Sequence, residues 1–126
     1  MSWYSGLNAR ILFDEPLTRH TTLRVGPAAK LWIEPADKEA LRILLKKIKA
    51  LQLEPLVIGC GSKLLIKKKK LPLAIHLGRA GFQACACEDN DIVAGAGARL
   101  PALLEIAYEN GVGGLEFLSG IPASVG

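Results

Sequence analysis

The chain has 126 residues, of which 50% are apolar and 22% are charged. This composition excludes an intrinsically disordered chain and is typical of one small folded unit. No apolar run reaches the roughly 20 residues of a membrane helix, and residues 1–16 lack the basic and apolar regions of a secretory signal. We therefore expect a soluble cytoplasmic protein with no membrane contact.

The net charge of +4 comes from one short run of lysines. Lys67 to Lys70 supply four positive charges, and the remaining chain balances at 12 positive against 12 negative. A nucleic-acid-binding face usually spreads its basic residues and interleaves aromatic ones. The run has no aromatic neighbour, so we interpret it as a solvated loop between strands. Nucleic-acid binding through it is the weakest of the alternatives.

Residues 28–34 alternate between apolar and charged side chains, which predicts a strand with one buried face. Trp32 is expected to pack under the helix that follows or against a neighbouring chain. Asp37 is a good N-cap for that helix, which runs to about Leu51 with an apolar stripe on one side. The helix is therefore expected to cover the strand.

Two further strands are predicted after this helix. Residues 55–58 are wholly apolar, as in a strand covered on both faces, and residues 71–77 read as another strand near the sheet. Strand, helix and strand together predict a βαβ unit.

The character of the sequence changes near residue 80. Residues 81–95 alternate loosely around a polar turn, which predicts an antiparallel hairpin. A helix is predicted over residues 101–110, with proline in its first turn and Asn110-Gly111 as its stop. Seven of the 13 glycines lie in residues 95–126, which favours close backbone approach to a ligand. A flexible end is the alternative for residues after about 120.

The cysteines and histidines do not form a metal-binding pattern. An odd set of three cysteines also fits no disulfide framework. We interpret Cys85 and Cys87, on one strand face, as small buried hydrophobic residues. His20 is interpreted as a loop residue that makes a hydrogen bond, and His76 as a structural or edge residue of an apolar strand.

The most informative local motif is the loop that follows residues 55–58. In Gly59-Cys-Gly-Ser62, successive backbone N–H groups can point into one concavity and bind phosphate. Ser62 adds a hydroxyl and Lys63 a charge. A Walker A loop is excluded because Ser precedes Lys, and a Rossmann fingerprint is excluded because its third glycine would be Leu64.

Four motifs in this order resemble one enzyme family. They are HTTLRVG at 20–26, VIGCGSKLLI at 57–66, AGAGARL at 94–100 and GVGGLEFLSGIPASVG at 111–126. Together they resemble the N-terminal half of UDP-N-acetylenolpyruvoylglucosamine reductase (UDP-N-acetylmuramate dehydrogenase), over about residues 16–126. The segment GLEFLSGIP is the most specific part of the match.

The resemblance implies an α+β fold, the FAD-binding domain of the vanillyl-alcohol-oxidase/PCMH type. Residues 1–78 would form a first, βαβ-containing subdomain. Residues 79–126 would begin a second, antiparallel subdomain that is truncated here, and the substrate domain would be absent.

The resemblance also implies a set of cofactor-binding residues, with the loop around Gly59 on the pyrophosphate of FAD. The implied residues are Gly59, Cys60, Gly61, Ser62, Lys63, Gly95, Gly97, Gly120, Ile121, Pro122, Ala123 and Ser124.

The family's reaction belongs to bacterial peptidoglycan synthesis. NADPH passes a hydride to FAD, which reduces UDP-N-acetylglucosamine enolpyruvate to UDP-N-acetylmuramate, with a serine, an arginine and a glutamate assisting. Those three groups lie in later segments of the family's chain. No catalytic residue is therefore assigned here, neither Ser124 nor Glu116, and these 126 residues alone are not expected to turn over.

The sequence departs from the family at several positions. In the loop GGGSN, Cys60 replaces a glycine and Lys63 an asparagine, and Ala123 replaces the last glycine of GIPG. These changes keep a second hypothesis open. A degenerate, non-enzymatic paralogue would keep the scaffold as a binding or assembly module and would self-associate through an exposed sheet edge.

Overall fold

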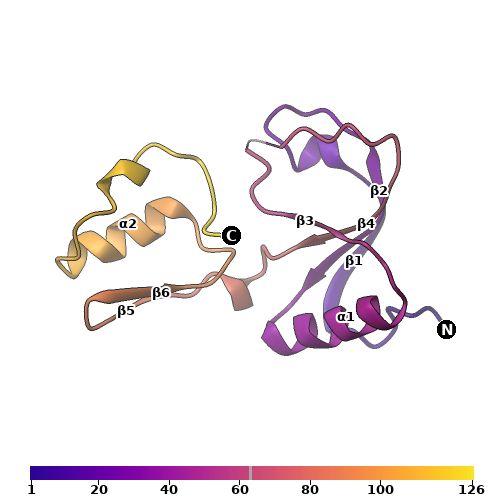
Figure 1. Cartoon of the computed structure of the whole chain (residues 1–126), viewed down its shortest axis with the longest axis horizontal. Helices are drawn as coiled ribbons and strands as arrows, with labels where there is room; N and C mark the ends of the chain where they lie inside the picture. The colour runs from indigo at the N-terminus through magenta and orange to yellow at the C-terminus, as the bar shows by residue number, and fades with distance from the viewer. Residues whose placement is uncertain (63) are drawn as a thin grey trace.

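The computed structural model describes residues 1–62 and 64–126 and has a mixed α+β fold, as expected. A four-stranded sheet with one helix forms the first part of the molecule, and a two-stranded hairpin with a second helix forms the other (Figure 1). The elements are β1 (Ala9–Pro16), η1 (Leu17–Arg19), β2 (Ala28–Pro35), α1 (Lys38–Ala50), β3 (Leu56–Ile58), β4 (Leu71–His76), η2 (Ala80–Phe82), β5 (Cys85–Glu88), β6 (Asp91–Ala94), α2 (Leu100–Glu109) and η3 (Glu116–Leu118), where η marks a short 3-10 helix.

The large sheet has the strand order β1-β2-β4-β3. β1 is antiparallel to β2, whereas β2, β4 and β3 run parallel. The predicted βαβ unit is present as β2, α1 and β3, but β4 lies between its two strands. β1 was not predicted from the sequence and extends the sheet beyond β2.

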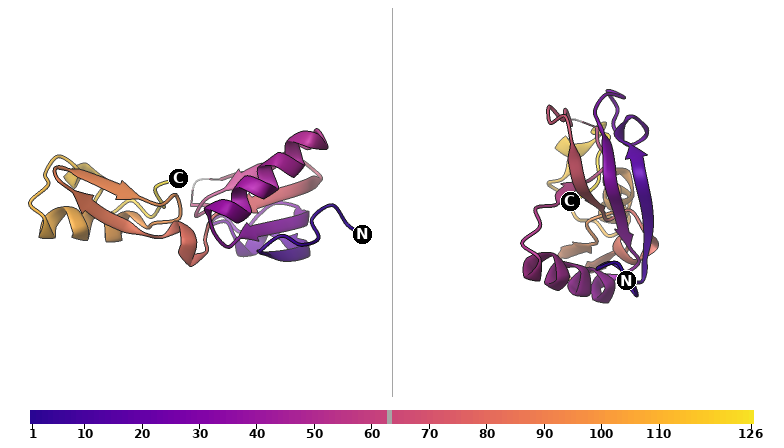
Figure 2. Two further views of the ribbon diagram at one scale, coloured as in Figure 1. Left: turned by 90° about the horizontal axis from the view of Figure 1, so that it is seen from below. Right: turned by 90° about the vertical axis from the view of Figure 1, so that its right-hand side faces the viewer.

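Helix α1 forms because its caps and its apolar spacing agree. Asp37 accepts a hydrogen bond of 2.8 Å from the backbone N–H of Ala40, which confirms the predicted N-cap. The helix covers one face of the sheet (Figure 2). Its buried side chains join those of β2 and β4 in one cluster, formed by Leu31, Ile33, Leu44, Ile48, Leu73 and Ile75.

Trp32 lies on the opposite face of the sheet, so its expected place under the helix is wrong. Side chains alternate along a strand, and Trp32 therefore points away from the face of Leu31 and Ile33. It is fully buried in a second cluster with Leu17, Ala29, Ile58, Leu71 and Ala74. β2 consequently has two buried faces rather than one.

A buried carboxyl accompanies this tryptophan. The indole Nε1 of Trp32 donates a hydrogen bond of 2.9 Å to Glu34 Oε1, and Glu34 is only 7% exposed. Arg10 pairs with the other carboxyl oxygen at 3.6 Å. These partners allow Glu34 to lie inside the sheet.

The expected two-sided burial of residues 55–58 is wrong. β3 is an edge strand, and Val57 is 61% exposed. The lysine run that follows, Lys67 to Lys70, is exposed between β3 and β4, as interpreted.

The second part of the molecule begins with the predicted hairpin. Two residues join β5 to β6, and Asp89 takes a positive φ of 56° in the turn. α2 packs on the hairpin and begins and ends within one residue of its predicted bounds. Cys85 and Cys87 share one face of β5, where both are half-buried with free thiols.

Residues 123–126 are hydrogen-bonded rather than forming a free end. They run antiparallel to residues 96–100, with Arg99 opposite Ser124. The N–H groups of Val125 and Gly126 donate to the carbonyls of Ala98 and Ala96, at 2.9 and 2.8 Å. Within the described residues, no helix has the length and apolar character needed to cross a membrane.

Candidate functional site

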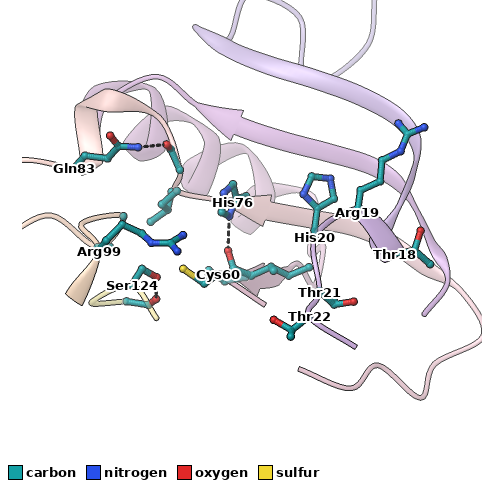
Figure 3. Close-up of a pocket in the computed structure, with 18 of the residues that line it drawn as sticks. Thr18, Arg19, His20, Thr21, Thr22, Cys60, His76, Gln83, Arg99 and Ser124 are labelled. Carbon is teal, nitrogen blue, oxygen red and sulfur yellow. Dashed lines mark hydrogen bonds between the residues drawn. The ribbon is translucent and has the colours of Figure 1, made fainter. Parts of the chain in front are cut away.

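A cavity of about 940 Å³ lies where the two parts of the molecule meet (Figure 3). β3 and β4 are parallel, so the segments that follow them emerge at the same end of the sheet. Ligands of open parallel sheets commonly bind at this end. The residues lining the cavity are Thr18, Arg19, His20, Thr21, Thr22, Arg24, Val57, Ile58, Gly59, Cys60, His76, Leu77, Gly78, Gln83, Ala96, Gly97, Arg99, Ser124 and Gly126.

Gly61, in the second sequence motif, packs against the first motif at His20. Its φ is +70°, a conformation that favours glycine, and a Cβ there would collide with the carbonyl of His20. The N–H of Thr22 donates to the Gly61 carbonyl at 3.0 Å. The loop at 59–62 is thus held against the turn at 20–22.

Gly59, in the second motif, packs against the fourth motif at Ser124 and Gly126. A Cβ on Gly59 would lie 2.7 Å from the carbonyl oxygen of Gly126 and 3.3 Å from Ser124 Oγ. A smaller cavity of about 180 Å³ lies along this contact, with Gly59, Cys60, Gly61, Ser62, Ala123 and Ser124 among its lining residues. Six of the predicted cofactor-binding residues therefore lie together.

Gly95 and Gly97 have a packing role. A Cβ on either would collide with a backbone carbonyl, that of Phe82 for Gly95 and that of Leu77 for Gly97. Gly97 also lines the large cavity, whereas Gly95 is not among its described lining residues. These glycines bring the turn after β6 close to Phe82 in η2 and to Leu77 just after β4.

The remaining predicted residues are not brought to this place. Gly120, Ile121 and Pro122 line neither the large nor the small cavity among the described residues. Gly120 has a φ of +80° and no atom within 4 Å of a Cβ position, so it serves a turn. The predicted Lys63 lies outside the described residues.

Both histidines line the large cavity and flank Trp32. The His20 ring stacks on the indole at a centroid distance of 3.9 Å, and the His76 ring lies at 5.4 Å. His20 Nε2 bonds to Glu15 at 2.9 Å, and His76 Nδ1 donates to the Ile58 carbonyl at 2.8 Å, since a carbonyl can only accept. The structural interpretations of both residues are confirmed, but their place in the cavity was not predicted.

The cavity is lined by positive and neutral groups. Arg19, Arg24 and Arg99 contribute guanidinium groups, and none of the lining residues that the structure describes is an aspartate or a glutamate. Four hydroxyl side chains add neutral hydrogen-bonding groups. An anionic ligand fits this lining.

Sequence reasoning missed Arg24 and Arg99, although both stand in the quoted motifs HTTLRVG and AGAGARL. Their position within those motifs was the available signal. Over residues 1–62 and 64–126, no group of three His, Cys, Asp or Glu side chains is arranged to hold a metal ion.

Comparison with models of known protein families gave no match for this chain. The chain is similar to proteins named UDP-N-acetylenolpyruvoylglucosamine reductase. It is 41% identical to that of Pelobacter propionicus over 124 residues, which are 97% of this chain and 42% of the relative. For Desulforamulus reducens the identity is 40% over 117 residues, covering 92% and 38% of the two chains.

The reductase of Moorella thermoacetica is 39% identical over 122 residues, covering 97% of this chain and 40% of the relative. The chain thus spans about two fifths of the length of these curated relatives. Over the part that it spans, the chain belongs to the UDP-N-acetylenolpyruvoylglucosamine reductase family.

Proposed function

We propose that this chain is the FAD-binding part of a UDP-N-acetylenolpyruvoylglucosamine reductase. The observation that carries the proposal is the large cavity, where the loop around Gly59 lies near Ser124 and three arginines, and no described lining residue is acidic. A dinucleotide carries a negative pyrophosphate, which this lining favours. The names of the relatives support a reductase.

We propose that this loop is a phosphate cradle. A Cβ on Gly59 or on Gly61 would come too close to neighbouring backbone atoms, so neither position has room for a side chain. The backbone N–H groups of residues 59–62 would bind the pyrophosphate, and Ser62 would add its hydroxyl. Lys63, outside the described residues, belongs to the same proposed loop.

Other residues of the proposed site have distinct tasks. Gly97, Ala123 and Ser124 would line the cofactor from the second part of the molecule. Gly95 would keep that part close to Phe82, and the turn at 120–122 would lead the chain back to the loop. We propose that the fold is of the PCMH type, with subdomains at residues 1–78 and 79–126.

When bound, FAD would carry hydride from NADPH to the enolpyruvyl group of UDP-N-acetylglucosamine enolpyruvate. This chain would contribute binding and orientation of the cofactor, in the cytoplasm of a bacterium. We assign no catalytic residue to it and expect no turnover by the 126 residues alone.

Titration of the purified chain with FAD tests the proposal. We expect flavin fluorescence to be quenched to saturation and the protein to keep a yellow colour after gel filtration. A chain that is folded by circular dichroism and neither retains nor titrates flavin would overturn the cofactor proposal. An NADPH-oxidation assay with the enolpyruvyl substrate tests the expected lack of turnover.

One observation favours the non-enzymatic alternative. β3 leaves an unpaired edge with Val57 61% exposed, which is a surface that a second copy can extend. A dimer whose mass is unchanged by FAD, in a chain that binds no flavin, would support an assembly module instead.

A further inference from the structure

We propose that Arg99 is a ligand-positioning residue, which binds a phosphate of the cofactor from the side opposite the loop at Gly59–Ser62. The inference rests on the proposed function and assigns Arg99 a role that the sequence analysis gave to no residue. The proposed ligand of Arg99 is a diphosphate ester, and we expect it to be FAD.

Three arginines line the cavity, and one of them, Arg19, is paired with Glu15 at 4.0 Å. Among the ion pairs found between described residues, none includes Arg24 or Arg99. Both guanidinium groups are therefore available to a phosphate, and each can donate two parallel hydrogen bonds to it.

Arg24 lies in the turn after η1 and belongs to the same part of the molecule as the loop at Gly59. Arg99 immediately precedes α2 in the other part, and Figure 3 shows its guanidinium directed toward the interior of the cavity. A ligand held by the loop and by Arg99 would contact both parts at once.

The backbone of Arg99 is fixed on both sides. Leu100 N–H donates to the Ala123 carbonyl at 3.0 Å, and Val125 N–H donates to the Ala98 carbonyl at 2.9 Å. The Arg99 carbonyl accepts the N–H of Leu103 at 3.2 Å, in the first turn of the helix. Binding therefore orders only the side chain, which lowers its entropic cost.

Two uncharged side-chain donors of the second part lie near Arg99 in the lining of the cavity. The hydroxyl of Ser124 donates to the Gly126 carbonyl at 2.9 Å, and the amide of Gln83 donates to the Gly78 carbonyl at 2.6 Å. Both groups already use a proton within the protein. The Gln83 amide keeps a second proton, but Arg99 is the only positively charged group among the described cavity-lining residues of the second part.

The test compares Arg99→Gln and Arg99→Lys with a matched control, Arg79→Gln. Arg79 is an exposed arginine before η2 and is not among the described residues lining the cavity. We expect Arg99→Gln to weaken FAD binding by about tenfold to hundredfold, as for loss of a charge-assisted hydrogen bond. Arg99→Lys should fall between, and Arg79→Gln should stay within about twofold of the unsubstituted chain.

Adenosine diphosphate and riboflavin separate the role of the phosphates. We expect Arg99→Gln to weaken competition by adenosine diphosphate as strongly as it weakens FAD binding. Any affinity for riboflavin, which has no phosphate, should stay unchanged. A loss for riboflavin equal to that for FAD, or equal losses in the Arg79 control, would overturn the inference.

The two proposals fail in different ways. If the unsubstituted chain binds FAD and Arg99→Gln binds it equally well, Arg99 has no positioning role and the proposed function stands. If the unsubstituted, folded chain binds no FAD, the proposed function fails and this inference fails with it.

Discussion

The α-carbon of Gly61 packs against the carbonyl of His20 so closely that no side chain fits between them. The two residues belong to motifs about forty positions apart in the sequence. A hydrogen bond of 3.0 Å from the Thr22 N–H to the Gly61 carbonyl stabilises the contact. The positive φ of Gly61, +70°, turns the loop into this position. The position of the loop at residues 59–62 against the turn at 20–22 therefore depends on one glycine.

Gly61→Ala is expected to destabilise the chain by about 2–4 kcal/mol, because it adds a left-handed strain of about 1 kcal/mol and a backbone collision. Gly6→Ala is the matched control. Gly6 has a φ of +75° but open space around a Cβ, so only the strain applies. Urea unfolding followed by circular dichroism measures both, and equal losses would contradict the proposed contact.

Trp32→Phe is expected to cost about 2–4 kcal/mol of folding free energy. The substitution removes the indole donor and leaves the buried Glu34 carboxyl short of a partner. Trp3→Phe, at a half-buried tryptophan in the N-terminal segment, should cost less than about 1 kcal/mol. Urea unfolding followed by circular dichroism distinguishes them, and a Trp32 variant as stable as the Trp3 variant would show that the buried bond contributes little.

Leu44→Ala and Leu45→Ala test the packing of α1. Leu44 is fully buried against β2 and β4, so its truncation should cost about 2–5 kcal/mol through lost burial and the cavity left behind. Leu45 is 47% exposed, and its truncation should cost under about 1 kcal/mol. Thermal unfolding of the two variants in the same buffer compares them, and the reverse order would show that the helix is rotated from its described face.

Glu39 is expected to titrate below its ordinary pKa of 4.5. Two hydrogen bonds from Arg42, at 2.6 and 2.8 Å, hold the pKa down, with the charge of Arg42 adding to the effect. Since the folded-state pKa is the lower one, ionised Glu39 favours folding above pH 4.5. That contribution is lost as the pH falls through the folded-state pKa.

An NMR titration of the Glu39 carboxyl carbon checks this expectation. Arg42→Gln should raise the pKa of Glu39 toward its ordinary value. Lys49→Gln, nearly three turns further along the same helix, should leave it where it was. An unchanged pKa in the Arg42 variant would show that the ion pair does not persist in solution.

The helices and the hairpin were predictable because their signals are local. Asp37 caps α1, Pro101 and Asn110 bound α2, and the polar turn marks the hairpin. The partners of each strand are not encoded locally. The sequence therefore did not reveal that β1 extends the sheet, that Trp32 faces away from α1, or that β3 lies at an edge.

In the candidate site, too, only the residues with a local signal could be predicted. The loop at Gly59 could be identified from its own residues, and the match to relatives extended the set to Ser124. Four further lining residues come together only because the two parts of the molecule meet: His20, His76, Arg24 and Arg99. Their spacing in the sequence does not indicate this contact.

The central place of β4 in the large sheet also sets an order of assembly. β2, α1 and β3 leave the ribosome first, yet β2 and β3 do not pair with each other. Their backbone donors and acceptors must wait for residues 71–76 to be synthesised and inserted between them. This non-local step is slower than local hairpin or helix formation. The edges of β2 and β3 that face each other across this gap therefore stay unpaired until β4 is inserted. Once Lys67 to Lys70 have been made, their four charges oppose the association of the incomplete sheet with other chains until that insertion.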